Sequence, residues 1–394
     1  MNKKKIKVGL LGKVVIAIVL GAILGLIVPE WIVRIGATFN ELFGNLLSFC
    51  IPLIILGLVA PSIGELGKNA GRLLLITTAI AYASTLFAGF FAYFSCRTTY
   101  PFLLGNVQQV SADTENLGKE ISPFFTVDIP PLMEVMTALV LAFLLGIGIA
   151  YIHGHTLRNA LADFKNIIEK TITVVIIPLL PYYIFTIFLK LSYSGEIVTI
   201  GSLFAKVIIV IFILHILLLL IQFITAGTIT KRNPFSLLRN MLPAYATALG
   251  TQSSAATIPV TLAQTIKNGV REEIANFTIP LCATIHLAGS TLKIVSCAIA
   301  IMMLQGMEIH LLQFVGFIFM LGITMVAAPG VPGGAIMAAI AVLQSILGFD
   351  NTAISLMIAL YIAMDSFGTA CNVTGDGAIA VVVDKIAGKN SENK

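Results

Sequence analysis

Charged residues are scarce in this sequence. Lysine, arginine, aspartate and glutamate make up 11% of its 394 residues, whereas hydrophobic residues make up 58%. Soluble domains carry about 25% charged residues, so this composition excludes an ordinary soluble enzyme. It predicts an all-α polytopic membrane protein that crosses the lipid bilayer several times.

Closely spaced cysteines and nucleotide-binding loops are also lacking. Five cysteines are scattered through apolar segments, which argues against a disulfide framework or a zinc site. We expect them to pack as small hydrophobic residues. We therefore expect no cofactor, no catalytic residues and no nucleic-acid partner, and an ion gradient as the energy source.

The N-terminus joins a basic stretch, Met1–Lys7, to an apolar run that ends near Pro29. A signal peptide has a similar pattern. The run is nearly long enough to span a membrane, and no clear cleavage site precedes Glu30. We expect a first membrane helix that stays in the protein.

Five further apolar segments are close to the ~20 residues that a spanning helix needs; they are 41–63, 72–95, 132–153, 171–192 and 202–227. The connections after the second, fourth and sixth helices are basic, whereas the long 96–131 loop is mainly acidic. The positive-inside rule then places both termini in the cytoplasm and this loop outside the cell. The expected location is the plasma membrane.

Two later segments, 234–265 and 312–348, are interrupted by glycine, proline and serine. The first is flanked by basic residues, whereas the second is flanked by acidic residues and by no lysine or arginine. We expect re-entrant hairpins that open to opposite sides of the membrane, each followed by one spanning helix, at 274–305 and 352–386. The predicted fold has eight transmembrane helices plus two re-entrant hairpins, arranged as inverted repeats. A kinked spanning helix is the alternative for each hairpin.

The last predicted helix carries four polar residues in an apolar context: Asp365, Thr369, Asn372 and Asp376. At 100° per residue they form one narrow stripe. An ionisable group at membrane depth costs several kcal/mol, so it normally faces a partner, an ion or water. The stripe predicts a binding site for something small and charged. A stripe that only bonds neighbouring helices is the alternative.

Several motifs resemble the sodium/dicarboxylate symporter family, which includes glutamate, aspartate and serine/threonine transporters. The motifs are Ser253-Ser254-Ala-Ala-Thr257-Ile-Pro259-Val-Thr261, Pro280-Leu-Cys-Ala-Thr284-Ile, Gly330-Val-Pro332-Gly and Asn372-Val-Thr-Gly-Asp376. The resemblance covers most of the chain. It implies symport of amino acids with sodium, a homotrimer and an elevator mechanism.

The resemblance also implies site residues. In the family, Asp365 would hold the α-ammonium of the substrate and Asn372 its α-carboxylate, while Val331 would act as the outer gate. The implied substrate-binding set is Ser253, Ser254, Ser290, Val331, Asp365, Gly368, Thr369 and Asn372. The implied cation-binding set is Cys282, Thr284, His286, Met325, Asn372 and Asp376.

Departures from the family pattern bear on coupling and on the substrate. Ala288 removes a carboxylate from a sodium region, and His286 replaces an asparagine, as a packing residue or as a proton carrier. Gly368 replaces the arginine of acidic-substrate members, which favours small neutral amino acids. The alternative is an acidic amino acid or dicarboxylate held by Lys293. Lys293 could otherwise pair with Asp365 or stand in for a sodium ion.

The resemblance further implies a domain division. Residues 1–70 and 132–195 would form a scaffold, residues 71–95 and 196–394 a transport domain, and residues 96–131 an external loop. An intramembrane aspartyl protease is a poor alternative, because Asp365 and Asp376 share one helix about 16 Å apart and cannot face each other. A passive channel would need a continuous polar pore, which the apolar Ala327 and Ala328 disfavour.

Overall fold

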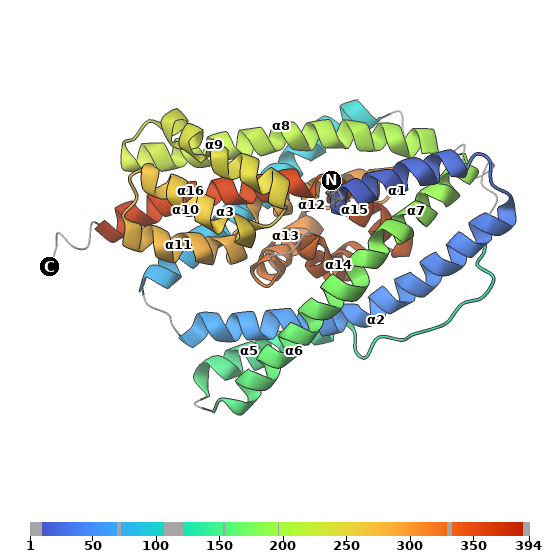
Figure 1. Cartoon of the computed structure of the whole chain (residues 1–394), viewed down its shortest axis with the longest axis horizontal. Helices are drawn as coiled ribbons and strands as arrows, with labels where there is room; N and C mark the ends of the chain where they lie inside the picture. The colour runs from blue at the N-terminus through green and yellow to red at the C-terminus, as the bar shows by residue number, and fades with distance from the viewer. Residues whose placement is uncertain are drawn as a thin grey trace, which may run out of the picture.

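The computed structural model describes residues 10–68, 72–105, 121–152, 154–195, 197–328 and 333–388. These residues form an all-helical protein without a strand (Figure 1). The all-α prediction is therefore confirmed for the described part of the chain. The first helices are α1 (Leu10–Leu24), α2 (Glu30–Lys68), α3 (Arg72–Leu104), α5 (Val135–Tyr151), α6 (Thr156–Thr171), the π-helical turn η2 (Ile172–Ile176), α7 (Ile177–Tyr193) and α8 (Ile197–Thr230).

The helices pack in two groups. Helices α1, α2, α5, α6 and α7 lie mainly against one another, whereas α3 and α8 pack on the C-terminal helices (Figure 1). The C-terminal helices are α9 (Pro234–Thr251), α10 (Ser254–Lys267), α11 (Glu272–Ile285), α12 (Ala288–Leu304), α13 (Leu311–Val326), α14 (Gly334–Leu347), α15 (Asn351–Ala363) and α16 (Asp365–Gly388). The predicted division into scaffold and transport domain remains a prediction.

Two pairs of consecutive short helices, α9 with α10 and α13 with α14, occupy the segments for which the sequence predicts re-entrant hairpins; that they re-enter the membrane stays a prediction. Helices α9 and α10 turn at Gln252, which has a left-handed backbone, and Ser253 caps α10 by accepting from the N–H of Ala256. Helices α13 and α14 are joined through Gly333, whose φ of 76° suits a residue without a Cβ. Residues 329–332, with the predicted gate residue Val331, lie outside the described residues.

Two helices that we expected to be continuous are broken. The segment 274–305 is interrupted at His286 and Leu287, between α11 and α12, and 352–386 is interrupted at Met364, between α15 and α16. The segment Glu272–Leu304 is apolar throughout despite its break, whereas the second break lies directly before the charged Asp365. The physical cause is tertiary, because side chains from other helices bind the backbone groups that the breaks expose.

Several predicted boundaries are also wrong. Helix α3 continues to Leu104, so the loop expected from residue 96 begins later. The basic connection before residue 171 is helical, and α6, η2 and α7 run on from Thr156 to Tyr193. Helix α6 escapes an apolar-run search because it is amphipathic, with only Leu161 and Ile168 buried.

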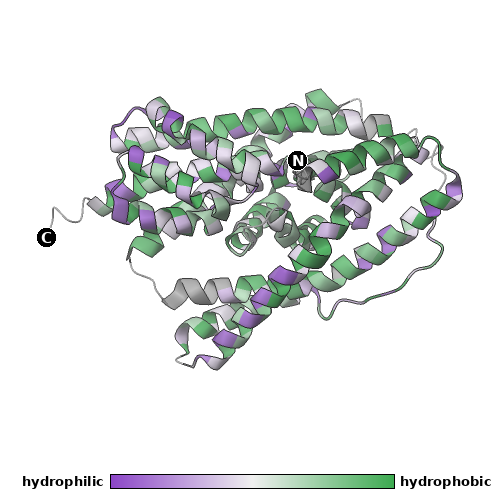
Figure 2. Ribbon diagram, in the orientation of Figure 1, coloured by the Kyte–Doolittle hydropathy of each residue, from purple (hydrophilic) through white to green (hydrophobic). Residues whose placement is uncertain are grey.

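Hydrophobic residues predominate along most helices, as the colours of the ribbon in Figure 2 show. Leu144, Ile209 and Ile216 are each more than half exposed, as expected for lipid-facing positions. Among the described residues, six continuous helical stretches are long and apolar enough to cross a membrane, and five more helices are apolar but shorter. The prediction of eight spanning helices and two hairpins remains a prediction.

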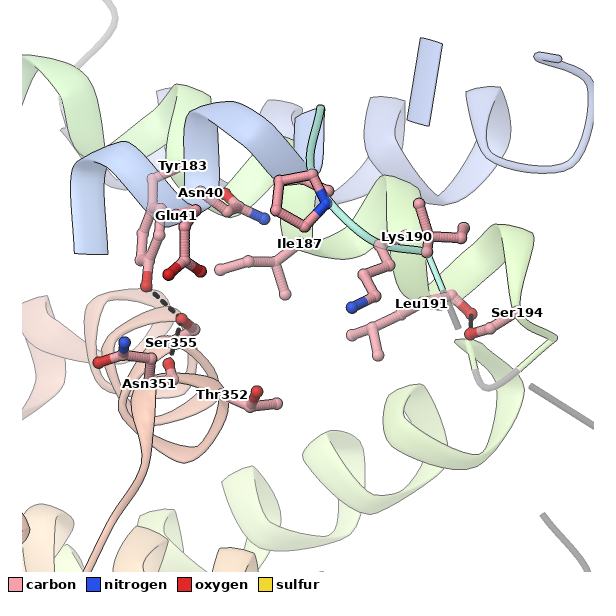
Figure 3. A pocket seen from close by; sticks show the side chains of 13 residues that line it. Asn40, Glu41, Tyr183, Ile187, Lys190, Leu191, Ser194, Asn351, Thr352 and Ser355 are labelled. Carbon is pink, nitrogen blue, oxygen red and sulfur yellow. Dashed lines mark hydrogen bonds between the residues drawn. The ribbon is translucent and has the colours of Figure 1, made fainter. Parts of the chain in front are cut away.

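A cavity of about 540 Å³ separates the two groups of helices where α2 and α7 face the start of α15 (Figure 3). Its walls carry polar side chains, including Glu41, Lys190 and Asn351. The hydroxyls of Tyr183 on α7 and Ser355 on α15 share a hydrogen bond across this boundary. Here the two groups of helices meet through polar contacts.

The contact between α1 and α7 generates a stability prediction. A Cβ at Gly21 would lie 2.5 Å from the carbonyl oxygen of Phe185, whereas a Cβ at Gly148 would meet nothing within 4 Å. Close approach of membrane helices through small residues is a common packing mode. We expect Gly21→Ala to destabilise the protein by about 1–3 kcal/mol and Gly148→Ala to be neutral or stabilising. Thermal unfolding in detergent would measure both, and equal effects would contradict the packing described.

Candidate functional site

A small cavity of about 30 Å³ lies between the start of α10 and the residues Ala328 and Ala335 on either side of the α13–α14 connection. A space of about 10–15 Å³ holds one water, so this cavity is too small for an organic substrate. Four chain segments line it: the α9–α10 tip, the α11–α12 break, the α13–α14 hairpin and the α15–α16 break. The lining residues are Gln252, Ser254, Ala283, Thr284, Leu287, Ser290, Ala328, Ala335, Tyr361, Asp365, Thr369 and Asn372.

The cavity brings together six residues that the sequence implies as site residues: Ser254, Thr284, Ser290, Asp365, Thr369 and Asn372. They come from four helices and span more than a hundred residues of sequence. The predicted stripe of Asp365, Thr369, Asn372 and Asp376 lies on α16, and all four side chains are buried. A ligand in this cavity would touch both hairpins at once.

Lys293 and Asp365 form an ion pair beside the cavity. The Lys293 side chain is completely buried, and its Nζ lies 3.2 Å from Asp365 Oδ1. It also donates to the carbonyl of Met364 at 3.4 Å and lies 3.4 Å from the centre of the Tyr361 ring. One of the alternatives for Lys293, pairing with Asp365, is therefore confirmed.

Gly368 has a definite steric role in this pair. A Cβ at residue 368 would lie 2.9 Å from Lys293 Nζ. The ammonium of Lys293 therefore stands in the space that a side chain at position 368 would enter. Glycine at this position and lysine at position 293 are complementary.

Asn372 holds the break between α11 and α12. Its Oδ1 accepts from the N–H groups of Gly289 at 2.8 Å and Ser290 at 3.2 Å, while its Nδ2 donates to Ser290 Oγ at 3.0 Å. These are first-turn N–H groups of α12, which have no partner inside their own helix. Tyr361 also donates to Ser290 Oγ, at 3.2 Å.

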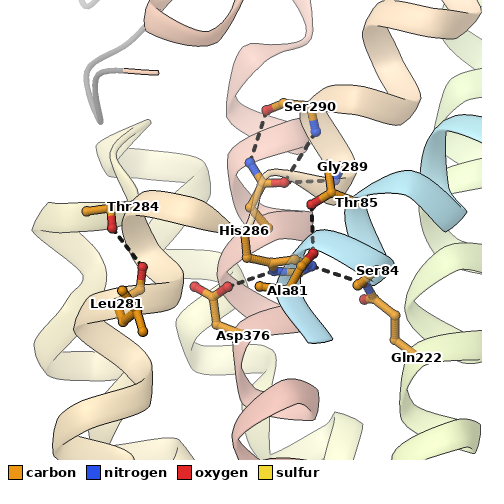
Figure 4. A network of polar contacts seen from close by, with 11 residues as sticks. Ala81, Ser84, Thr85, Gln222, Leu281, Thr284, His286, Gly289, Ser290 and Asp376 are labelled. Carbon is orange, nitrogen blue, oxygen red and sulfur yellow. Dashed lines mark hydrogen bonds and ion pairs between the residues drawn. The ribbon is translucent and has the colours of Figure 1, made fainter. Parts of the chain in front are cut away.

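A second polar network surrounds Asp376 (Figure 4). Asp376 Oδ1 lies 2.8 Å from His286 Nδ1, and His286 Nε2 lies 3.1 Å from Ser84 Oγ. Gln222 donates to the same hydroxyl at 3.0 Å. The network joins α16, α11, α3 and α8, so His286 is a hydrogen-bonded link between four helices.

The remaining implied cation ligands are more dispersed. The Thr284 hydroxyl donates to Leu281 O at 2.7 Å, and Met325 O accepts from Ala328 N at 3.2 Å. The Cys282 and Met325 side chains are buried and do not line the cavity. No group of three or more His, Cys, Asp or Glu side chains in the described residues could hold a metal ion. A cation here would rely on carbonyl and hydroxyl oxygens beside one carboxylate, which suits a hard ion.

Sequence reasoning missed several residues that the structure places in these networks. Tyr361 lies one turn before Asp365, a spacing that could have been noticed. His215 on α8 is buried, and its Nε2 lies 3.0 Å from Gly289 O. A single histidine, serine or glutamine in an apolar helix is visible in the sequence, but its partner on another helix is not.

The model of the sodium:dicarboxylate symporter family matches residues 10–386 of this chain. A serine/threonine transporter of Acinetobacter baumannii is 26% identical over 397 residues, which cover 98% of this chain and 98% of the relative. Excitatory amino acid transporter 5 of mouse is 33% identical over 163 residues, which cover 41% of this chain and 29% of the relative. Human excitatory amino acid transporter 1 is 30% identical over a match that covers 42% of this chain and 31% of the relative.

The bonds of Asn372 generate a prediction about the ligand-free protein. Asn372→Leu removes the acceptor of two buried N–H groups, and each unsatisfied group costs about 1–3 kcal/mol. We expect a clear fall in the unfolding temperature without any ligand. Asn159→Leu, on the exposed surface of α6, serves as the control. A fully stable Asn372→Leu protein would show that Asn372 does not hold the break.

Proposed function

The chain belongs to the sodium:dicarboxylate symporter family, and on this premise we propose that it is a secondary active symporter that couples a cation gradient to the uptake of amino acids. The observation that supports this most is the small polar cavity between α10 and the described ends of the α13–α14 connection, with Asp365 in its wall. Broken helices that point their ends at one buried site are typical of secondary transporters. Non-helical backbone at membrane depth is tolerated only where it is buried in protein or lines a cavity.

The proposed cycle begins with the opening of one hairpin. Because the cavity is far smaller than an amino acid, a hairpin tip has to move away before a substrate can bind. Asp365 would then face the substrate's ammonium and Asn372 its carboxylate, with Ser253 and Ser254 on the opposite tip. Closure would follow, and the transport domain (71–95 and 196–394) would slide against the scaffold (1–70 and 132–195). We propose this for a homotrimer in the plasma membrane with both termini cytoplasmic.

Small neutral amino acids are the proposed substrates, because Gly368 supplies no side-chain cation. The naming of a full-length relative as a serine/threonine transporter supports this choice. A second candidate, an acidic amino acid or dicarboxylate, is favoured by one observation. Lys293 places its ammonium within 2.9 Å of the Cβ position of residue 368, so it could meet a substrate carboxylate there.

Sodium is the proposed coupling ion, with one or two ions at most. Ala288 supplies no carboxylate, and His286 fills the space beside Asp376 with a ring that already bonds Ser84. Protons as an additional coupling ion are part of this proposal. The alternative is sodium alone, with Lys293 as a static counter-ion, and the contact between Lys293 and Asp365 supports that alternative.

The two buried carboxylates should have separable roles. We expect Asp365→Asn to weaken amino-acid binding by at least about tenfold, because the ammonium would lose a charge-assisted partner. Asp376→Asn should instead weaken the sodium dependence of uptake and leave the preference among amino acids unchanged. Uptake into proteoliposomes at several sodium concentrations measures both. A change of amino-acid preference in Asp376→Asn with an intact sodium response would refute the assignment.

The substrate class can be decided by competition. With an imposed sodium gradient, serine, alanine and threonine should compete for uptake at least about tenfold better than glutamate or succinate, because no free cation awaits a side-chain carboxylate. Lys293→Met should then leave the preference for neutral substrates in place. Preferential uptake of glutamate or succinate, lost in Lys293→Met, would establish the second candidate instead.

A further inference from the structure

The ammonium of Lys293 is bound in the way that a free ammonium ligand would be bound. A carboxylate, a backbone carbonyl and an aromatic face surround it, from Asp365, Met364 and Tyr361. Met364 is the break between α15 and α16, Tyr361 lies in the last turn of α15 and Asp365 begins α16, while Lys293 comes from α12. The lysine is completely buried, so this arrangement is not a side chain reaching for the membrane surface.

Asp365 connects this ammonium to a hairpin tip. Its Oδ1 faces Lys293, and its Oδ2 accepts from the N–H of Gly333 at 2.7 Å. Gly333 directly precedes α14, the second helix of the α13–α14 hairpin. One carboxylate therefore binds both the lysine and the start of α14, beside a cavity of only about 30 Å³.

A carrier has to bring its binding site back across the membrane after it releases its cargo. A carboxylate that loses its cationic partner on release would then be buried unpaired, which is strongly unfavourable. In this protein the tethered ammonium of Lys293 already neutralises Asp365. The empty site can therefore close without a bound cation or ammonium ligand to neutralise Asp365.

Resting on the proposed function, we propose that Lys293 is a built-in substitute for the substrate's ammonium, which lets the empty transport domain close and return. The protein then performs net uptake and does not depend on exchange or on a counter-transported cation. An incoming ammonium has to displace Lys293 from Asp365. Lys293 therefore lowers the affinity for amino acids and speeds the return of the empty carrier.

The test compares net uptake into empty proteoliposomes with exchange into proteoliposomes preloaded with the same amino acid. For the wild type we expect similar rates in both. For Lys293→Met we expect net uptake to fall by at least about tenfold, because the empty site would bury an unpaired carboxylate. Exchange should persist, because the loaded site still pairs Asp365 with an ammonium, and its KM should decrease.

Two further variants frame the result. Lys206→Met removes a lysine whose Nζ binds Leu103 O far from the site, and it should behave as the wild type. Lys293→Arg keeps the charge and should retain more net uptake than Lys293→Met. Exchange well above net uptake in the wild type, or an equal loss of both rates in an otherwise folded Lys293→Met, would overturn the proposal.

A ligand-free measurement separates this inference from the proposed function. The five native cysteines are buried, so fluorophores can be placed at Tyr151→Cys on α5 and Leu312→Cys on α13, both 82% exposed in the native protein. Without substrate, energy transfer should fluctuate between states in the otherwise native protein and become static on Lys293→Met. Static transfer in both proteins would overturn the inference. Absence of uptake for every amino acid would count against the proposed function alone.

Discussion

Two carboxylates are buried inside this apolar helical protein, and each needs a partner. This need is the constraint on which the rest of the structure depends. Asp365 and Asp376 lie on the same helix, and both side chains are almost fully buried. Each is held by a nitrogen from a different helix, Lys293 for one and His286 for the other. The long, interrupted path of the chain after residue 234 brings these partners into place.

Helix breaks are the second part of this arrangement. A continuous helix satisfies its own backbone and has nothing to offer a ligand or a partner. At the break before α12 the free N–H groups of Gly289 and Ser290 bind Asn372, and at the break before α16 the carbonyl of Met364 binds Lys293. The polar side chains and the free backbone groups at the breaks therefore support each other, and Asn372 and Ser290 among them also line the cavity.

The sequence predicts this part of the molecule unevenly, for physical reasons. The stripe follows from local periodicity and lies buried on α16, and the turn residues near Ser253 lie between α9 and α10. The breaks at Met364 and His286 do not follow, because side chains far along the chain bind the backbone there. The link from His286 to Ser84 joins residues 202 positions apart, and no local pattern encodes such a pairing. Resemblance to a family narrows the choice of partner residues, but it does not give the distances between their side chains.

The cavity between α2, α7 and α15 has a consequence for how the two groups of helices could move. Surfaces that are dry and apolar adhere, and separating them in water exposes area at a cost of about 25 cal/mol per Å². Here the facing walls carry Glu41, Lys190 and Asn351 around about 540 Å³ of open space, and water can bridge such groups at little cost. In the sliding motion proposed above, a hydrated polar margin would exchange one set of water contacts for another. It would therefore resist the motion less than a dry apolar interface of the same area.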